Sequence, residues 1–305
     1  MLRTAFLAAA KSPRLRGATE RSTLARPVVR RFVAGEQPDD ALAVARALIA
    51  DRLVSLDYLG ENTRDRPQAD ETTDAYLALL YRLGAEDLAG RVEVSVKLSA
   101  LGAALSGDGF SVALDNAAKI CAAAAEVGTT VTVDMEDHTT TDATLDTVRA
   151  LRADWPATGA VLQAHLRRTE ADCVSLSGLG SRVRLCKGAY DEPSSVAFRD
   201  RAEVSDSYRR CLRVLMSGSG YPMVATHDPV LIGLAAELAE AHAREFEFQM
   251  LYGIRPEAQR ALAAAGHRVR VYVPYGSAWF PYFMRRLGER PANLTFFLRA
   301  LASHH

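Results

Sequence analysis

Residues 94–99 read VSVKLS and residues 131–136 read VTVDME, and in both stretches apolar and polar side chains alternate. Alternation with a period of two is typical of a β-strand whose two faces meet different surroundings. From about residue 53 onward the chain repeats one order, a short β-branched run followed by turn residues and a helical stretch rich in alanine and leucine. Strands that alternate with helices in this way predict βα units and a parallel sheet.

The repeat occurs eight times, which favours a closed (β/α)8 barrel of the TIM type over an open doubly wound sheet. The predicted strands are residues 53–58, 92–98, 130–135, 160–165, 183–187, 223–227, 246–251 and 269–273. The predicted helices include residues 113–126, 144–152, 206–216, 229–242 and 256–265. No Pro/Ser-rich linker divides the chain, so we expect a single α/β domain, with the barrel in residues 53–303. Residues 1–52, with a helix over 40–52, are predicted to form an N-terminal helical cap packed on the barrel.

The alternating strands also predict what lies inside the barrel. One face of each strand meets the outer helices and the other points inward, and the apolar sets suit the helices. The polar side chains expected to point inward are Lys97, Asp134, Gln163, Arg184, Gln249 and Tyr272. Burial of so many polar groups costs several kcal/mol each unless they are paired. An interior filled with ion pairs is one interpretation, but we favour a binding site near the C-terminal mouth.

Composition and missing motifs exclude several classes of protein. Lysine plus arginine and aspartate plus glutamate are balanced at 37 each, which argues against a nucleic-acid partner. The four cysteines lie far apart without a C-x-x-C pair, which predicts reduced thiols in a cytoplasmic protein. Neither G-x-G-x-x-G nor G-x-x-x-x-G-K-[ST] is present, so a Rossmann dinucleotide site and a P-loop are not expected.

Lysines and histidines at strand ends leave two other chemistries open. Lys97 and Lys187 end predicted strands, and an inward lysine with a lowered pKa could form a Schiff base with a carbonyl substrate. Acids on the neighbouring strands would instead raise that pKa. His138, His165 and His227 follow different strands, so the sequence leaves a metal triad open. We favour hydrogen-bonded polar residues at these positions and assign no metal.

The segment YFMRRLGE, residues 282–289, follows the last predicted strand. On a helix, Tyr282, Arg285, Arg286 and Glu289 have the spacing i, i+3, i+4 and i+7, which puts them on one face. Two guanidinium groups on one face can clamp a carboxylate with bidentate hydrogen bonds, and Glu289 would neutralise and orient one of them. A solvated face of Arg/Glu pairs explains the spacing equally well. The aromatic ring beside the arginines favours a small acid that carries a ring.

These segments, in order and spacing, resemble the proline dehydrogenase family, in its monofunctional bacterial branch. The resemblance covers roughly residues 30–300. It rests on LVSLDYLGE (53–61), SVKLSALG (95–102), VTVDMED (131–137), LQAHLRRT (162–169), RVRLCKGAY (182–190), VATHD (224–228), EFQMLYG (247–253), VYVPYG (271–276) and YFMRRLGERPANLTFF (282–297).

The resemblance implies an FAD enzyme that oxidises L-proline to 1-pyrroline-5-carboxylate, the first step of proline catabolism to glutamate. The hydride goes to flavin N5 and the electrons then go to a membrane quinone. A separate pyrroline-5-carboxylate dehydrogenase acts downstream. A cytoplasmic protein that meets the inner face of the membrane peripherally is therefore expected. A catalytically silent barrel that binds an amino acid or a partner remains the alternative from outside enzymology.

The resemblance also implies a role for each matching residue. Asp134 and Arg184 would be catalytic, with Asp134 orienting an arginine of the final helix and Arg184 lying against flavin N5. Proline would be bound by Lys97, Leu251, Tyr272, Tyr282, Arg285 and Arg286. FAD would be bound by Asp134, Gln163, Arg184, Lys187, Gly188, Ala189, Thr226, His227, Gln249 and Glu289. The chain departs from bifunctional relatives at Asp191 and Glu192, where no tryptophan stands for adenine contacts.

Overall fold

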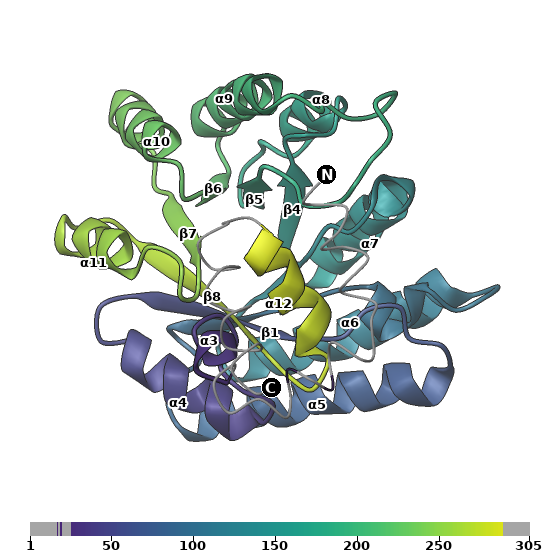
Figure 1. Cartoon of the computed structure of the whole chain (residues 1–305). Coiled ribbons are helices and arrows are strands. Elements are labelled where there is room, and N and C mark those ends of the chain that lie inside the picture. Colours follow the sequence, from purple (N-terminus) through teal and green to yellow (C-terminus); the bar gives the residue numbers. More distant parts are fainter. Residues whose placement is uncertain (1–16, 18, 20–25, 289–305) are drawn as a thin grey trace, which may run out of the picture.

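A computed structural model describes residues 17, 19 and 26–288 of the chain. Within this part, eight parallel strands form a closed barrel in which each strand pairs with its neighbour in sequence and β8 pairs with β1 (Figure 1). The strands are β1 (Leu53–Tyr58), β2 (Val92–Val96), β3 (Val131–Val133), β4 (Gly159–Gln163), β5 (Arg182–Cys186), β6 (Tyr221–Ala225), β7 (Glu247–Leu251) and β8 (Val269–Tyr275). Every strand overlaps a predicted one, so the (β/α)8 barrel is confirmed.

Helices follow the strands and surround the barrel. The described helices are α3 (Arg26–Arg30), α4 (Pro38–Leu48), α5 (Arg66–Ala85), α6 (Gly109–Glu126), α7 (Thr141–Asp154), α8 (Thr169–Ser175), α9 (Arg201–Ser217), α10 (Pro229–Ala241), α11 (Pro256–Ala264) and α12 (Trp279–Gly288). Aspartates fix where several of them begin, because an N-cap carboxylate accepts hydrogen bonds from the free N–H groups of the first turn. Asp65 caps α5, Asp200 caps α9 and Asp228 caps α10 in this way.

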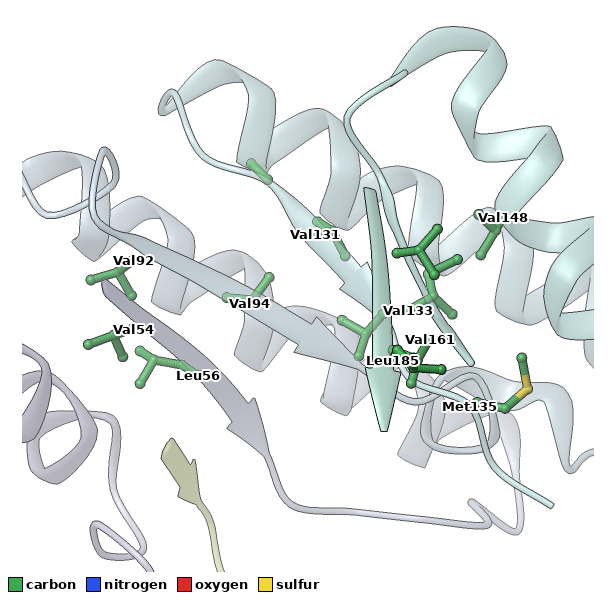
Figure 2. Close-up of a cluster of buried hydrophobic side chains, with 14 of the residues drawn as sticks. Val54, Leu56, Val92, Val94, Val131, Val133, Met135, Val148, Val161 and Leu185 are labelled. Carbon is green, nitrogen blue, oxygen red and sulfur yellow. The ribbon is translucent and has the colours of Figure 1, made fainter. Parts of the chain in front are cut away.

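The outward face of the strands is apolar and packs against the helices. Figure 2 shows part of this layer, with Val54 and Leu56 of β1, Val94 of β2 and Val131 and Val133 of β3. All five side chains are buried and belong to one continuous hydrophobic core. The period-two pattern therefore sends the apolar side chains outward to the helices, as the sequence predicts.

The inward face carries polar side chains, and those farthest from the C-terminal mouth pair with one another. Arg182 Nη2 lies 2.7 Å from a carboxylate oxygen of Glu93, and Arg270 Nε lies 2.7 Å from one of Glu247. Glu93 also accepts from Thr132, and all these acceptors are buried. These charges form the ion-paired interior that was the alternative interpretation, while the residues nearer the strand ends surround a cavity. The ion-paired interpretation is therefore confirmed for the level far from the mouth, and binding at the level of the cavity stays a prediction.

Two helices, α4 before β1 and α12 after β8, occupy unusual places for a (β/α)8 barrel. In a (β/α)8 barrel the helix after β8 would cover β8 and β1 on the outside. Here α4 packs against these two strands, with Leu42 and Leu48 in the main core. The helix that follows β8, α12, instead lies across the mouth (Figure 1) and packs in one cluster with Val28 of α3 and with Phe32, which follows α3. The ring centroids of Phe32 and Phe283 are 6.3 Å apart. This arrangement places α12 over the carboxyl ends of the strands.

Some predictions fall on residues that the structure does not describe. They include the opening of the expected N-terminal cap and everything after residue 288, with Glu289 and the RPANLTFF segment. The division of the chain at residue 52 stays a prediction, since α4 shares the core of the barrel. Among the described helices, none has the length and apolar character to cross a membrane.

Candidate active site

A cavity of about 520 Å³ opens at the C-terminal ends of the strands, beneath α12. Its size falls in the range of small-molecule and cofactor sites, and this end of a (β/α)8 barrel is where such sites are found. It brings together every described residue assigned from the sequence: Lys97, Asp134, Gln163, Arg184, Lys187, Gly188, Ala189, Thr226, His227, Gln249, Leu251, Tyr272, Tyr282, Arg285 and Arg286. Of the assigned residues, only Glu289 lies outside the described part.

Asp134 follows β3 and joins three of these side chains. Its Oδ1 accepts from Arg184 Nη1 at 2.6 Å, and its Oδ2 accepts from the Tyr272 hydroxyl at 2.7 Å. Lys97 Nζ lies 3.8 Å from Oδ2. Burial raises the pKa of the Asp134 carboxyl, and the charges of Arg184 and Lys97 oppose that rise. The sequence analysis expected Asp134 to orient an arginine of α12, but the arginine that it contacts here lies in β5.

Arg184 is held as a fixed cation in the barrel wall. Its Nε donates to the side chain of Gln249, and its Nη2 donates to Ser95 Oγ at 2.9 Å. Its guanidinium lies 5.2 Å from the ring centroid of Tyr272. Burial alone would lower the pKa of Arg184, but Asp134 and Glu93 raise it above its usual value. The arginine therefore presents a permanent positive charge to the cavity.

Lys97 is paired with Asp57, whose Oδ1 accepts from the lysine Nζ at 2.7 Å. Burial by itself would lower the pKa of Lys97, but Asp57 and then Asp134 raise it above the usual lysine value. The Schiff-base hypothesis requires a neutral lysine, so this environment opposes it at Lys97. The other candidate, Lys187, donates to Asp228 at 3.0 Å, where the same carboxylate group caps α10.

The predicted face of α12 points into the cavity. Tyr282, Arg285 and Arg286 all line it, and Tyr282 and Arg286 are buried. The solvated-face interpretation is therefore wrong for these three residues. Arg286 lies 5.3 Å from the ring centroid of Tyr282. Arg285 Nη2 donates to Glu61 at 3.0 Å, so an acid from the loop after β1 supplies the partner that the sequence analysis looked for in Glu289.

The loop after β5 forms another wall. Gly188 has a φ of 102°, and a Cβ built there would lie 2.4 Å from the imidazole of His165, so a side chain has no room. The imidazole of His165 occupies the place that a side chain would take, and Gly188 lines the cavity beside Lys187 and Ala189. On the neighbouring strand β4, Gln163 Nε2 donates to the carbonyl oxygen of Glu136 at 2.7 Å.

The loop after β6 is tied to β7. The backbone N–H of Leu251 donates to Nε2 of His227 at 2.9 Å. This bond makes Nε2 an acceptor, which leaves the proton of a neutral ring on Nδ1. Thr226 Oγ1 accepts from the backbone N–H of Asp228 at 3.1 Å. His227 therefore has a structural role in addition to lining the cavity.

Several residues of the cavity were not predicted from the sequence. Asp57, Glu61, Cys186, Tyr190 and Asp228 line the cavity as well. The motifs LVSLDYLGE, RVRLCKGAY and VATHD contain all five, and period-two alternation from Ser55 would have turned Asp57 inward. Burial raises the pKa of the Cys186 thiol to about 11, so this cysteine is protonated at neutral pH.

Metal binding was left open from the sequence. Among the described residues, no group of three or more His, Cys, Asp or Glu side chains is arranged to hold a metal ion. The carboxylate of Asp134, which lies in the same cavity, accepts from Arg184 and Tyr272, and His227 accepts from Leu251. His138 contacts the carboxylate of Glu192.

Comparison with known proteins gives three kinds of match. Residues 43–299 match the family described as proline dehydrogenase. The chain is 40% identical over 277 residues to proline dehydrogenase of Deinococcus radiodurans, covering 89% of both chains. It is 37% identical to proline dehydrogenase 1 of Bacillus subtilis, covering 89% of this chain and 90% of the relative.

A solved structure shares the fold. It is proline utilization A from Bdellovibrio bacteriovorus inactivated by N-propargylglycine, with a TM-score of 0.80 and 25% identity. The match covers 86% of this chain and 32% of that one, so this chain spans about a third of the solved protein.

Proposed function

The chain belongs to the proline dehydrogenase family, and we propose that it oxidises L-proline to 1-pyrroline-5-carboxylate with FAD as its cofactor. The observation that carries this proposal is the meeting of Lys97, Arg285 and Arg286 at one cavity that also contains the Asp134–Arg184 pair. Three cations at one end suit a carboxylate, and the rings of Tyr272 and Tyr282 suit the pyrrolidine.

The donor set and the loop shape fit a flavin. The loop at Lys187, Gly188 and Ala189 lines this side of the cavity, and Gln163, Arg184 and Lys187 offer polar groups to a flavin there. We assign FAD to this side of the cavity, with Thr226 and His227 toward its ribityl-phosphate portion. When bound, FAD would supply the N5 atom that accepts hydride and hold the electron pair until a quinone takes it.

The protein's own residues bind and orient proline. Arg285, Arg286 and Lys97 hold the carboxylate, so that one edge of the ring faces the flavin side. Proline loses a hydride from C5 and a proton from its nitrogen, which gives the C=N bond of the product. Arg184 is a fixed cation beside the site where negative charge develops, and its bonds to Asp134 and Gln249 hold it there. Tyr282 and Leu251 exclude water from the ring.

The further course of the electrons and product rests on the family resemblance. We propose that a membrane quinone takes the electrons and that a separate dehydrogenase oxidises pyrroline-5-carboxylate. A quinone in the bilayer requires a peripheral meeting with the membrane.

The decisive experiment is a visible spectrum of the purified protein, followed by L-proline under anaerobic conditions. Flavin absorption bands that bleach with proline would support both cofactor and substrate. A flavin that stays oxidised would refute proline as the substrate while keeping the cofactor. A protein that takes up no flavin even when FAD is supplied would refute the proposal as a whole.

A further inference from the structure

We propose that Asp57 is a positioning residue for substrate binding, which fixes the Lys97 ammonium at the cavity wall and keeps it charged. The inference deepens the proposed function and rests on it in one respect, that Lys97 binds the substrate carboxylate. Asp57 would act through Lys97 and would not itself touch proline or flavin.

The barrel places the two residues together. Asp57 lies near the end of β1, and Lys97 follows β2, the strand that pairs with β1 in parallel. Asp57 is 1% exposed, and its Oδ1 accepts from Lys97 Nζ at 2.7 Å. Lys97 Nζ is 3.8 Å from Asp134, whose oxygens already accept from Arg184 and Tyr272. Asp57 is therefore the nearer acid and the one that Lys97 does not share with another cation among the described residues.

The second oxygen of Asp57 points to a role beyond folding. Oδ2 is buried and has no hydrogen-bond partner among the described residues. A buried carboxylate oxygen without a partner costs free energy, and what this charge gains is a counter-charge for the buried Lys97 ammonium. We therefore assign Asp57 the role of holding that ammonium for the substrate.

The environment of Lys97 explains why a counter-charge is needed. Burial is the largest influence on its pKa and acts to lower it, whereas Asp57 is the strongest influence that raises it. Among the described residues, the other charged groups that act on this ammonium come from neighbouring strand ends and loops. Asp134 and Glu61 raise the pKa of Lys97. Glu136 lies near the same ammonium, and Arg184 lies beyond Asp134. Without Asp57, burial would act against one fewer acid, so the pKa of Lys97 would be lower than in the wild type.

The test measures carboxylate binding instead of turnover. The probe is tetrahydrofuran-2-carboxylate, a five-membered ring that keeps the carboxylate and has no titratable nitrogen. Its dissociation constant is measured by calorimetry from about pH 7 to about pH 10 on FAD-loaded wild type, Asp57→Asn and Asp57→Glu. Removal of Asp57 lowers the pKa of Lys97, so a larger share of the lysine is neutral at pH 10, and binding weakens roughly fivefold when about four fifths of it is neutral. Asp57→Asn should show this alkaline loss, whereas wild type and Asp57→Glu should not.

A double variant shows whether Asp57 acts through Lys97. Arginine keeps its proton at these pH values, so Lys97→Arg/Asp57→Asn should lose the alkaline weakening whatever its affinity at pH 7. The proposal is overturned if Asp57→Asn weakens binding equally at every pH, or if the double variant keeps the alkaline loss.

If Asp57→Asn does not fold, wild type and Lys97→Arg still test the proposal. Binding of the probe to wild type should be constant over the same pH range. An alkaline loss of binding in wild type that Lys97→Arg abolishes would overturn the proposal. Because the probe has a ring oxygen in place of the proline nitrogen, its dissociation constants do not depend on whether proline reduces the flavin.

Discussion

Removal of the Arg285 guanidinium is the most direct test of the carboxylate clamp. Arg285 lines the cavity from α12 beside Arg286, and its side chain is about one quarter exposed. Arg285→Met keeps most of the aliphatic length and removes the charge. The change leaves Arg286 and Lys97 in place, so binding should weaken without being abolished.

The size of the rise in KM follows from the loss of the Arg285 guanidinium as a partner of the substrate carboxylate. Truncation of one member of a buried charge pair costs about 2–4 kcal/mol, which corresponds to a roughly 30- to 900-fold rise in KM for proline. Part of that cost comes from Glu61, which is 3.0 Å from Arg285 and would be left unpaired near the incoming carboxylate. Arg285→Met/Glu61→Gln removes this repulsion and should recover part of the loss.

The assay is steady-state proline oxidation with an artificial electron acceptor, together with the flavin spectrum of each variant. We expect KM to rise strongly while flavin occupancy stays at the wild-type level, because Arg285 is assigned to the substrate and not to the cofactor. A change in KM of less than about threefold would refute the clamp. A loss of flavin with unchanged KM would move Arg285 to the cofactor side.

Three further predictions test the cavity wall and the interior. Arg184→Ala should slow the anaerobic reduction of the flavin by proline more than it weakens proline binding, as measured by stopped-flow absorbance. A change in flavin occupancy alone would contradict the role given to this cation. Gly188→Ala should reduce FAD retention and the melting temperature more than Gly266→Ala does. Both glycines have positive φ, but only a side chain at Gly188 would meet another side chain, that of His165. Equal effects of the two substitutions would show that crowding at Gly188 is unimportant. Burial would raise the pKa of Glu93, but Arg270, Arg182 and Arg184 hold it at about 2. A pKa below the unfolded value of about 4.3 stabilises the fold above that pH, so about 2 kcal/mol should be lost as pH falls from about 5 to about 2.5. Urea unfolding between about pH 5 and pH 2.5 should show this loss in wild type and a flatter dependence in Glu93→Gln, and equal slopes would exclude Glu93 as the cause.

The sequence alone determined the barrel and the direction of most site residues. Alternation with a period of two is a property of the local backbone, so it turned Lys97, Asp134 and Arg184 inward without knowledge of their neighbours. The helical spacing of Tyr282, Arg285 and Arg286 was equally local, and all three reach the cavity. Strand ends differed by a few residues, because hydrogen bonding to the neighbouring strand decides where pairing stops.

Only the tertiary structure decided which charges pair. Asp57 and Lys97 are 40 residues apart, Asp134 and Arg184 are 50 apart, and Glu61 and Arg285 are 224 apart. Closure of the barrel brings their strand ends and loops together, and no local pattern specifies such distances. The same holds for α12, which lies across the mouth because α4 covers β8 and β1 on the outside. The sequence therefore determined the side chains that face the cavity, whereas barrel closure decided the partner of each charge and hence the charge state in which each one acts.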